Sequence, residues 1–434
     1  DEHRFPSSDP FSWTADGRRW YLHEWLSEVL LYVVQSSIGF SAAVALTAGT
    51  IVATLAVVYR LALRACSREL VVLGLVFLAA AMMLEFTKVR PQVFTWLFFA
   101  IFVRQLYLSY RGEAVSLWPL PILMAVWSNM HLGYLFGLGT MYIWLICMIF
   151  RDQRPSLTSL RAPLVVTGLA TLAPVISPLG PRALLVPFDY LGNGSVAFDN
   201  IEEWASPDFH ILTFAPMIIG IAVLFITGLP LGRKQLFGTA LTIVLLAAAL
   251  VSSRNMPFFA FVMPIVAAES IAQRWPAAKS LPQAGSQALN WAIVTLVVAL
   301  SLVALPFFGR QLHSDPKVPS DMPPEGVTYI REHPMGGRMF NSYNWGGYLI
   351  YELYPDVKVS IDGRSDLYGD GILQQYLDIT GLSSRWRDEL GELDPNFILL
   401  PKSSTLAVAL RDEAAWKVAF EGRVEVIFIP AQTP

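Results

Sequence analysis

The sequence predicts a polytopic α-helical membrane protein with a small α/β domain at its C-terminal end. Hydrophobic side chains make up 54% of the 434 residues and charged ones only 15%, and the mean hydropathy is +0.48. Soluble globular domains are less apolar and more charged than this. Ten apolar stretches lie between residues 39 and 308, each close to the roughly 20 residues that cross about 30 Å of hydrocarbon. The loops between them alternate in charge, which favours alternate sides of a membrane.

Residues 1–38 are expected to form an external first loop that ends in an interfacial helix. Turn-forming Pro, Asp and Gly residues fill positions 1–19. From Trp20 to Val34 apolar side chains recur at helical spacing, but His23 and Glu24 interrupt the stripe. Such a segment is too polar to span a bilayer, and its aromatic flanks suit the headgroup region.

Residues 39–308 are expected to form the transmembrane core. The expected spans are 39–61, 69–87, 91–109, 114–130, 133–150, 161–177, 211–230, 235–252, 255–272 and 289–308. Because the chain opens without Met in what is expected to be an external loop, one more span is expected upstream.

The charge of the loops predicts the orientation of the core. One set of loops is short and basic, which places it in the cytoplasm. Its members are Arg60, Arg64, Arg68, Arg104, Arg111, Arg151, Arg154, Arg161, Arg233, Lys234, Arg274 and Lys279. The other set is expected outside, together with residues 309–434. It holds Asp9, His23, Glu24, Lys88, Arg90, Asn129, His131, residues 199–208, Arg254 and Asn255.

Residues 309–434 are expected to form an external α/β domain that follows a linker at 309–322. Short β-type runs alternate with helical patterns, which favours a mostly parallel sheet. The expected strands are Arg338–Asn341, Val357–Ile361, Phe397–Leu400 and Val424–Ile429. The expected helices are 323–332, 345–353, 370–380, 384–393 and 404–413.

Two external turns carry cations that are followed by a proline at the start of the next helix. The first holds Lys88 and Arg90, and the second holds Arg254 and Asn255. A guanidinium is a fork for phosphate oxygens, and Lys adds a point charge. These four residues are therefore the expected phosphate-binding group. The alternatives are that Lys88 and Arg90 reach toward lipid headgroups, and that Arg254 forms a structural ion pair.

Four further residues are candidates for proton transfer. Asp9 and Glu24 are carboxylates just above the expected interface, where one of them could serve as a general base. His23 lies beside Glu24, and His131 lies in an external turn with Asn129. A histidine there could share a proton at neutral pH. The alternative is that Asp9 is an ordinary turn residue, that Glu24 is a solvated side chain, and that His131 is a hydrogen-bonded turn histidine.

The sequence gives little support for a metal. No second His follows His131 at helical spacing, so a transition-metal site is weakly indicated. The acids of the external loop 178–210 could bind Mg²⁺ or Mn²⁺ through oxygen ligands. No spacing in that loop requires it, and a solvated acidic loop is the simpler interpretation.

Several of these segments together resemble a known family. They are Ser7-Ser-Asp-Pro-Phe-Ser-Trp-Thr, Trp20-Tyr-Leu-His-Glu-Trp-Leu, Arg90-Pro-Gln, Trp127-Ser-Asn-Met-His and Arg254-Asn-Met-Pro. The chain resembles bacterial integral-membrane glycosyltransferases of the GT-C superfamily, which includes protein mannosyltransferases and oligosaccharyltransferase catalytic subunits. The resemblance implies a donor sugar on polyprenyl phosphate, a catalytic acid in the first external loop and a cationic pocket for the lipid phosphate. Asp9 matches that loop region, although the family's acid often follows a first span that is absent here.

The α/β domain carries a fainter resemblance. The run Tyr343-Asn-Trp-Gly-Gly-Tyr-Leu-Ile is similar to the Trp-Trp-Asp-Tyr-Gly region of oligosaccharyltransferases, but Trp345 stands where that motif has its acid. Trp345 and Tyr348 are therefore candidates for an acceptor cleft, with Asp362 and Arg364 at the end of a strand and with Asn129. The alternative is a helix start that packs Trp345 and Tyr348 into the core.

The expected function is transfer of a sugar from a polyprenyl-phosphate donor to an acceptor at the outer face of a bacterial inner membrane. The expected partners are that donor lipid and the surrounding membrane lipids. A net charge of −3 does not favour nucleic-acid binding. A non-catalytic GT-C-like accessory subunit of a larger membrane complex is the alternative. A transporter is less favoured, because the charges lie chiefly at the ends of the spans.

Overall fold

The computed structural model describes residues 8–151, 157–185, 196, 204–276 and 321–431. These residues divide into two units. A helical unit contains residues 23–151, 157–185 and 204–276, and a sheet unit contains residues 8–22 and 321–431. The expected first loop is thus divided after Leu22, because residues 8–22 belong to the sheet unit and the helix that follows belongs to the helical unit.

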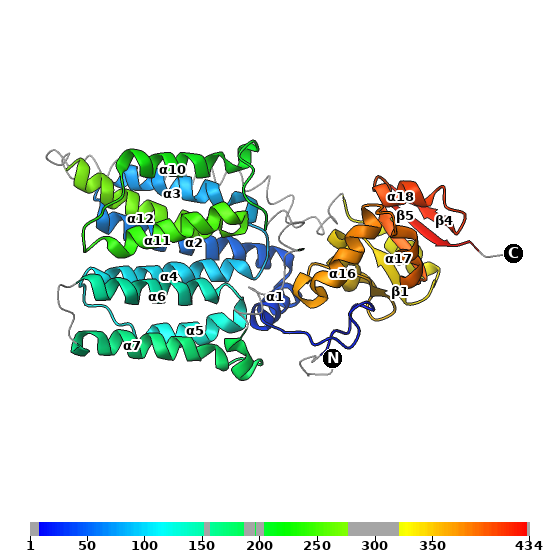
Figure 1. Ribbon diagram of the computed structural model, residues 1–434, viewed down its shortest axis with the longest axis horizontal. Helices are drawn as coiled ribbons and strands as arrows, with labels where there is room; N and C mark the ends of the chain where they lie inside the picture. The colour runs from blue at the N-terminus through cyan, green and yellow to red at the C-terminus, as the bar shows by residue number, and fades with distance from the viewer. Residues whose placement is uncertain (1–7, 152–156, 186–195, 197–203, 277–320, 432–434) are drawn as a thin grey trace. The chain divides into compact units, whose positions relative to one another are not determined.

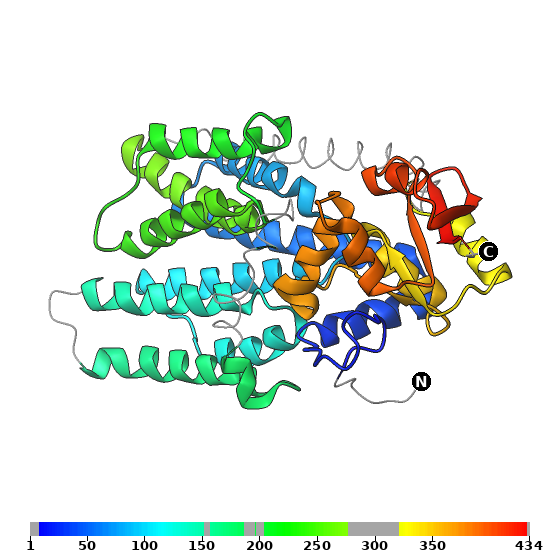
Figure 2. The same cartoon turned by 45° about the vertical axis from the view of Figure 1, so that its right-hand side comes forward.

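The helical unit is a bundle of apolar helices that run side by side (Figures 1 and 2). Its helices are α1 (Trp25–Ile38), α2 (Phe40–Ala65), α3 (Glu69–Met83), α4 (Gln92–Tyr110), α5 (Pro119–Met130), α6 (Tyr134–Arg151), α7 (Leu157–Leu172), α10 (Ala215–Thr227), α11 (Leu236–Val251) and α12 (Met256–Arg274). The short 3-10 turns that bear on the site are η1 (Leu84–Phe86), η2 (Ala173–Val175) and η5 (Ser253–Asn255).

Five helical segments in the described part of the chain are long and apolar enough to cross a membrane. They are Phe40–Ala65, Glu69–Phe86, Gln92–Tyr110, Tyr134–Arg151 and Ser253–Arg274. The expected spans at 161–177, 211–230 and 235–252 correspond to shorter apolar helices, so ten spans are not confirmed. The expected span 114–130 is a helix of only 12 residues, which begins at Pro119. The expected span 289–308 and the linker 309–322, apart from its last two residues, lie outside the described residues.

The outer surface of the helical unit is apolar in a way that suits lipid rather than water. Phe77 is 75% exposed and Phe225 is 87% exposed. The inside of the bundle is organised around α12, which packs against α2, α3, α4, α10 and α11. Exposed apolar patches of this extent mark a surface that another apolar phase covers.

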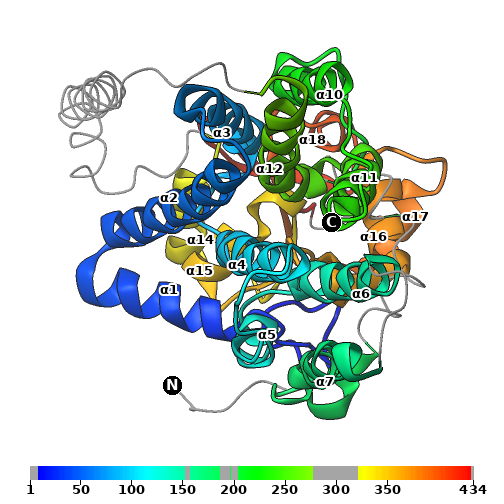
Figure 3. The same ribbon diagram turned by 90° about the vertical axis from the view of Figure 1, so that its left-hand side faces the viewer.

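Helix α1 lies across one end of the bundle, at a steep angle to the helices that it contacts (Figures 1 and 3). It packs against α2 and α5 and leaves Tyr32 and Ile38 exposed. Gly39, with φ of 115°, forms the turn into α2, a backbone conformation that side chains disfavour. An interfacial helix was expected from Trp20 to Val34, and the observed helix begins and ends about one turn later.

The basic loops meet at the opposite end of the bundle. Arg64 pairs with Glu113 at 2.7 Å, Arg274 donates to the Ile226 carbonyl and Arg151 donates to the Tyr110 carbonyl. Arg111 pairs with Glu269, a side chain of α12 that is only 3% exposed and also accepts from Tyr107 at 2.7 Å. Helix α4, 19 residues and about 28 Å long, separates these contacts from the α1 end.

The sheet unit is a five-stranded sheet between two layers of helices. Its strands are β1 (Arg338–Asn341), β2 (Lys358–Val359), β3 (Phe397–Pro401), β4 (Trp416–Glu421) and β5 (Glu425–Pro430). Helices α14 (Pro324–Glu332) and α15 (Gly346–Leu353) share one apolar cluster with the sheet. Helices α16 (Ser365–Thr380), α17 (Trp386–Leu393) and α18 (Thr405–Leu410) share the cluster on the other face. Alternate strand residues, such as Met339 and Phe340, fill the two clusters.

The strand order is β2-β1-β3-β5-β4. Strands β2, β1 and β3 are parallel as expected, but β5 and β4 are antiparallel. The expectation of a mostly parallel sheet was wrong at this edge, because β4 was not recognised and forms a hairpin with β5. Residues 11–13 extend the other edge, where Val359 donates to the Phe11 carbonyl and accepts from the Trp13 amide at 3.1 Å each.

Candidate functional site

The candidate site is a polar cluster at the α1 end of the helical unit. Glu24 is the residue before α1, and its side chain does not cap the helix. Its Oε1 lies 3.6 Å from Nε2 of His23 and 3.4 Å from Nε2 of His131. The side chains of His23, Glu24 and His131 are 20%, 24% and 10% exposed. A carboxylate therefore lies between two imidazoles in a partly buried setting.

Two contacts of the first turn of α1 hold Glu24 at this position. The Trp25 indole donates to Oδ1 of Asn129 at 2.8 Å, and the Ser27 hydroxyl donates to the Met130 carbonyl. Asn129 in turn donates to the carbonyls of Ala125 and Ile176, at 2.7 and 2.9 Å. Asn129, expected in an acceptor cleft, thus ties α1 to α5 and to the end of η2.

His131 is fixed from its other side. Its Nδ1 accepts from the Gly133 amide at 2.8 Å and lies 2.9 Å from the Thr95 hydroxyl. Thr95 also accepts from the Trp127 indole at 2.8 Å. The burial of His131 lowers its pKa well below the ordinary value, and the charges of Arg254 and His23 act in the same direction. His131 is therefore neutral at neutral pH.

Arg254, in the second cationic turn, lies close enough to His131 for its charge to lower the pKa of that ring. Arg254 lies in η5, with its guanidinium 5.4 Å from the ring centroid of Trp204. Asn255 donates to the Ala248 carbonyl at 3.1 Å and so closes the end of α11. A guanidinium on an indole face remains able to donate hydrogen bonds from its edge to an anion.

Lys88 and Arg90 lie in the turn between η1 and α4, and both are exposed. Gln92 donates to the Phe86 carbonyl at 3.0 Å across the base of this turn. Thr95, in the first turn of α4, contacts His131, so Lys88 and Arg90 lie at the same end of the bundle as Glu24. The described members of the expected external loops within the helical unit therefore converge on one end.

The remaining predicted residues lie in the sheet unit, where Asp9 is fully enclosed. Its carboxylate accepts from the Phe11 and Ser12 amides at 3.2 and 2.9 Å, from the Ser12 hydroxyl, and from Arg364 at 2.7 Å. Burial alone would raise the pKa of Asp9, but the hydrogen bonds from Ser12 and Arg364 and the charge of Arg364 outweigh it and the pKa is lowered. This geometry favours a structural role for Asp9 over that of a base.

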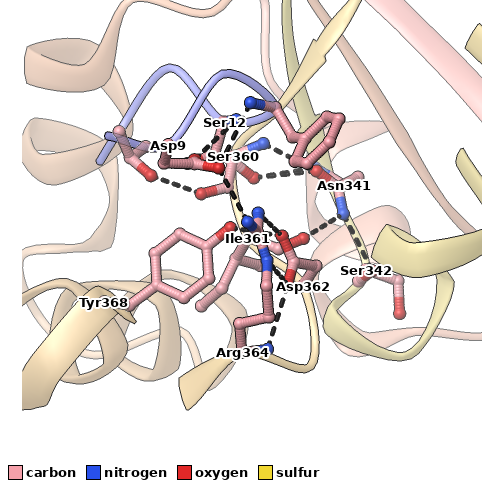
Figure 4. Close-up of polar contacts among 11 residues, drawn as sticks. Asp9, Ser12, Asn341, Ser342, Ser360, Ile361, Asp362, Arg364 and Tyr368 are labelled. Carbon is pink, nitrogen blue, oxygen red and sulfur yellow. Dashed lines mark hydrogen bonds and ion pairs between the residues drawn. The ribbon is translucent and has the colours of Figure 1, made fainter. Parts of the chain in front are cut away.

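Arg364 is the centre of this cluster (Figure 4). It pairs with Asp362 through Nε at 2.8 Å and Nη2 at 2.6 Å, and it lies over the rings of Phe11 and Trp20 at 5.3 and 4.7 Å. Burial opposes the charge of Arg364, but the contacts with Asp362 outweigh it and raise its pKa. The polar tip expected at the end of β2 exists, and residues 8–22 cover it.

The two aromatic candidates of this unit do not form a cleft. Trp345 is 3% exposed, packs in the core against Leu349 and donates to the Asp321 carbonyl at 2.8 Å. Tyr348 is half-buried against the same core, and burial raises its pKa. The expectation that Trp345 faces an acceptor cleft was wrong, because the Trp345 indole, beside a glycine pair, fills the core of the sheet unit instead.

The described residues contain no group of three or more His, Cys, Asp or Glu side chains arranged for a metal. Of the acids in loop 178–210, Asp208 is exposed and pairs with His210 at 2.9 Å. Asp189, Asp199, Glu202 and Glu203 lie outside the described residues.

The sequence reasoning missed Thr95, Gly133 and Trp204. A signal existed for Gly133, since a glycine two residues after a turn histidine lets a backbone amide approach the ring. A Cβ on Gly133 would lie 2.5 Å from the Thr95 methyl group and 2.8 Å from Nδ1 of His131. No protein-family model and no curated protein matches this chain.

Proposed function

We propose that this protein is a membrane glycosyltransferase that moves a sugar from a polyprenyl-phosphate donor to an acceptor hydroxyl. The observation that carries the proposal is the convergence of Glu24, His131 and Arg254 at one end of an apolar bundle. A carboxylate and a cation at one end of a lipid-compatible surface are the groups that such a transfer needs. The resemblance of the loop motifs to GT-C enzymes points to the same chemistry.

In this proposal Glu24 is the general base. The acceptor oxygen attacks the anomeric carbon as its proton passes to Glu24, and the bond from that carbon to the phosphate oxygen breaks. The phosphate leaves on the polyprenyl chain with its electron pair. Because Glu24 lies between His23 and His131, its carboxylate is held in one place, and positioning of this kind supplies much of the rate.

Arg254 is the proposed partner of the phosphate, with Lys88 and Arg90 supplying further positive charge at the same end. Negative charge builds up on the leaving phosphate in the transition state, and a fixed guanidinium stabilises it there. The polyprenyl tail would lie on the exposed apolar side chains of the bundle. No step of this scheme uses a metal ion.

The proposed location is a bacterial inner membrane, with the chain crossing several times and the Glu24 end outside. The charge of the loops supports this orientation, because exposed cations such as Arg64 and Arg233 gather at the other end. The sheet unit would then lie outside, since residues 8–22 directly precede the Glu24 end of the helical unit.

Binding of polyprenyl phosphate to the purified full-length protein tests the phosphate site without knowledge of the sugar. Arg254→Ala removes charged hydrogen bonds worth about 1.5–3 kcal/mol, so the Kd should rise roughly tenfold to a hundredfold. Glu24→Gln should bind the lipid phosphate as the parent does but lose transfer from polyprenyl-phosphate mannose and related donors. Glu28→Gln, an exposed carboxylate one turn further along α1, is the matched control.

Equal lipid-phosphate binding by the parent and by Arg254→Ala would contradict the proposed phosphate site. Transfer that survives Glu24→Gln would remove the proposed base. A parent protein that binds no lipid phosphate, and that copurifies with other membrane subunits in fixed ratio, would favour an accessory subunit instead.

A further inference from the structure

We infer that Thr95 and the Gly133 amide are positioning groups that hold the His131 ring in one tautomer and direct its Nε2–H at Glu24. His131 then orients the carboxylate, and Glu24 is the group that takes up the acceptor's proton. The catalytic consequence rests on the proposed function, but the tautomer is a property of the protein without substrate.

The Gly133 amide decides the tautomer. A backbone N–H can only donate, and it lies 2.8 Å from Nδ1 of His131, so Nδ1 must offer its lone pair. A neutral imidazole has one protonated and one unprotonated nitrogen. The proton is therefore on Nε2, which lies 3.4 Å from Oε1 of Glu24.

Thr95 reinforces this arrangement. Its oxygen accepts from the Trp127 indole at 2.8 Å, which leaves the hydroxyl proton to be donated to Nδ1 of His131 at 2.9 Å. Thr95 is 1% exposed and Trp127 is fully buried. A buried chain of donors thus runs from Trp127 through Thr95 to His131, whose Nε2 lies 3.4 Å from Glu24.

Burial first, and then the positive charges of Arg254 and His23, keep the His131 ring neutral. The titratable and charged groups that face it are His23 and Glu24, at the start of α1, and Arg254 in η5. Burial, Arg254 and His23 lower the pKa of His131, in that order of size. A neutral ring has one proton, and the Gly133 amide determines where it lies.

Nitrogen NMR of the full-length protein labelled with ¹⁵N-histidine reads the tautomer directly. The His131 signals, assigned by their loss in His131→Gln, should show a protonated Nε2 and an unprotonated Nδ1 at neutral pH. They should remain those of a neutral ring as the pH falls to about 6, near the ordinary pKa of histidine. A protonated Nδ1 in the parent protein would overturn the inference.

Variants at Thr95 test the functional consequence. Thr95→Val keeps the shape but removes one of the two donors to Nδ1, so that only the Gly133 amide opposes the other tautomer. The population of the Nδ1-protonated form should therefore rise, and kcat should fall about fivefold to tenfold. One hydrogen bond of about 1 kcal/mol corresponds to that change. KM for a polyprenyl-phosphate mannose donor should not change, and Thr95→Ser should restore both the tautomer and the rate.

Thr140→Val is the matched control, because Thr140 is a buried threonine of α6 whose hydroxyl donates to the Phe136 carbonyl of its own helix at 2.7 Å. If Thr95→Val and Thr140→Val gave the same tautomer and the same kcat, Thr95 would have no positioning role. A fixed tautomer with no transfer by any variant would support the arrangement of the ring and count against the proposed function.

Discussion

Arg364 joins two stretches of chain that are 355 residues apart in sequence. It pairs with both Asp9 and Asp362, which are 0% and 2% exposed, while its own side chain is 19% exposed. Two buried carboxylates with no cation between them would each lose the interaction that offsets the loss of water. The rings of Phe11 and Trp20 cover the guanidinium. We therefore expect this one side chain to contribute much of the free energy that holds residues 8–22 on the sheet unit, beside the backbone pairing with Val359.

Replacing Arg364 with Ala should release residues 8–22. Removal of one partner from a buried ion pair costs about 3–5 kcal/mol, so the free energy of local opening of this segment should fall by that order. Hydrogen exchange of the full-length protein, measured on peptides from residues 8–22, gives this free energy.

The matched control is Arg387→Ala. Arg387 also pairs with a carboxylate, Glu413, and lies over a ring, Trp386, but its side chain is 63% exposed. An exposed pair is worth about 1 kcal/mol or less, so exchange in residues 8–22 should not change. Acid gives an independent check, because a lowered pKa of Asp9 means stability that is present above its ordinary value of 3.8 and lost as the pH falls through the folded value. Unchanged protection in Arg364→Ala would show that the strand contacts with Val359 are sufficient.

The sequence could identify the polar residues of both clusters but not their partners. Asp9 and Arg364 were both recognised as candidates, yet nothing in a linear pattern pairs residues so far apart. His23, Glu24, His131 and Arg254 were placed at one end of the bundle because loop charge and span length determine which loops share a side. Their distances depend on packing by Thr95 and Gly133, which carry no charge. The position of Gly133 two residues after a turn histidine was a signal, but nothing in the linear pattern pointed to Thr95.

At the scale of elements, the start of α15 depends on close packing against the residues after β2. A Cβ on Gly346 would lie 2.3 Å from the Ile361 carbonyl oxygen and 2.6 Å from Cα of Asp362. Both are backbone atoms of the strand end that carries Asp362, so they cannot move without displacing it. The two glycines at the predicted helix start therefore have different structural roles.

Gly346→Ala should destabilise the sheet unit, whereas Gly347→Ala should not. Overpacking costs typically about 1–3 kcal/mol, while Gly347 has nothing within 4 Å of its Cβ position and alanine favours a helix by up to about 1 kcal/mol. Hydrogen exchange of peptides from β1 and β3 in the full-length variants measures the difference. Equal losses for the two variants would mean that the close approach is relieved by a shift of α15.

The helices and strands could be predicted where the apolar periodicity of the sequence was strong. The prediction failed where tertiary packing determines the element. Strand β1 was expected with its observed bounds, and the five helices of the sheet unit were expected within a few residues of their observed ends. Strand β4 was missed because its side chains are mostly half-exposed on an edge, so no apolar run marks it. The expected span 114–130 is longer than the observed helix α5, because the apolar run begins before Pro119, where the helix starts.

At the scale of the whole molecule, the helical unit has two chemically different ends. One end holds Glu24, His131, Lys88 and Arg254, and the other holds Arg64, Arg151, Arg274 and their partners. The positive-inside rule predicts which end faces the cytoplasm, and this orientation decides whether the proposed donor can reach Arg254 from the outer leaflet.

Labelling of single cysteines in intact cells should distinguish the two ends. In a Cys66→Ala, Cys147→Ala background, Lys88→Cys should react with a maleimide that does not cross membranes, because Lys88 is exposed at the Glu24 end. Lys234→Cys, exposed at the basic end, should react only after the cells are permeabilised. The reverse pattern would place the Glu24 cluster inside and would exclude an outer-leaflet donor.

The contact between residues 11–13 and Val359 has a practical consequence for dissecting this protein. The sheet unit is discontinuous in the gene, because residues 11–13, which pair with its edge at Val359, are encoded before the first helix of the bundle. A fragment that starts near Asp321 would leave a hydrogen-bonding edge uncovered, and such edges recruit other copies of themselves. Joining residues 8–22 to that fragment through a flexible tether would supply the missing neighbour and yield a soluble, monomeric piece.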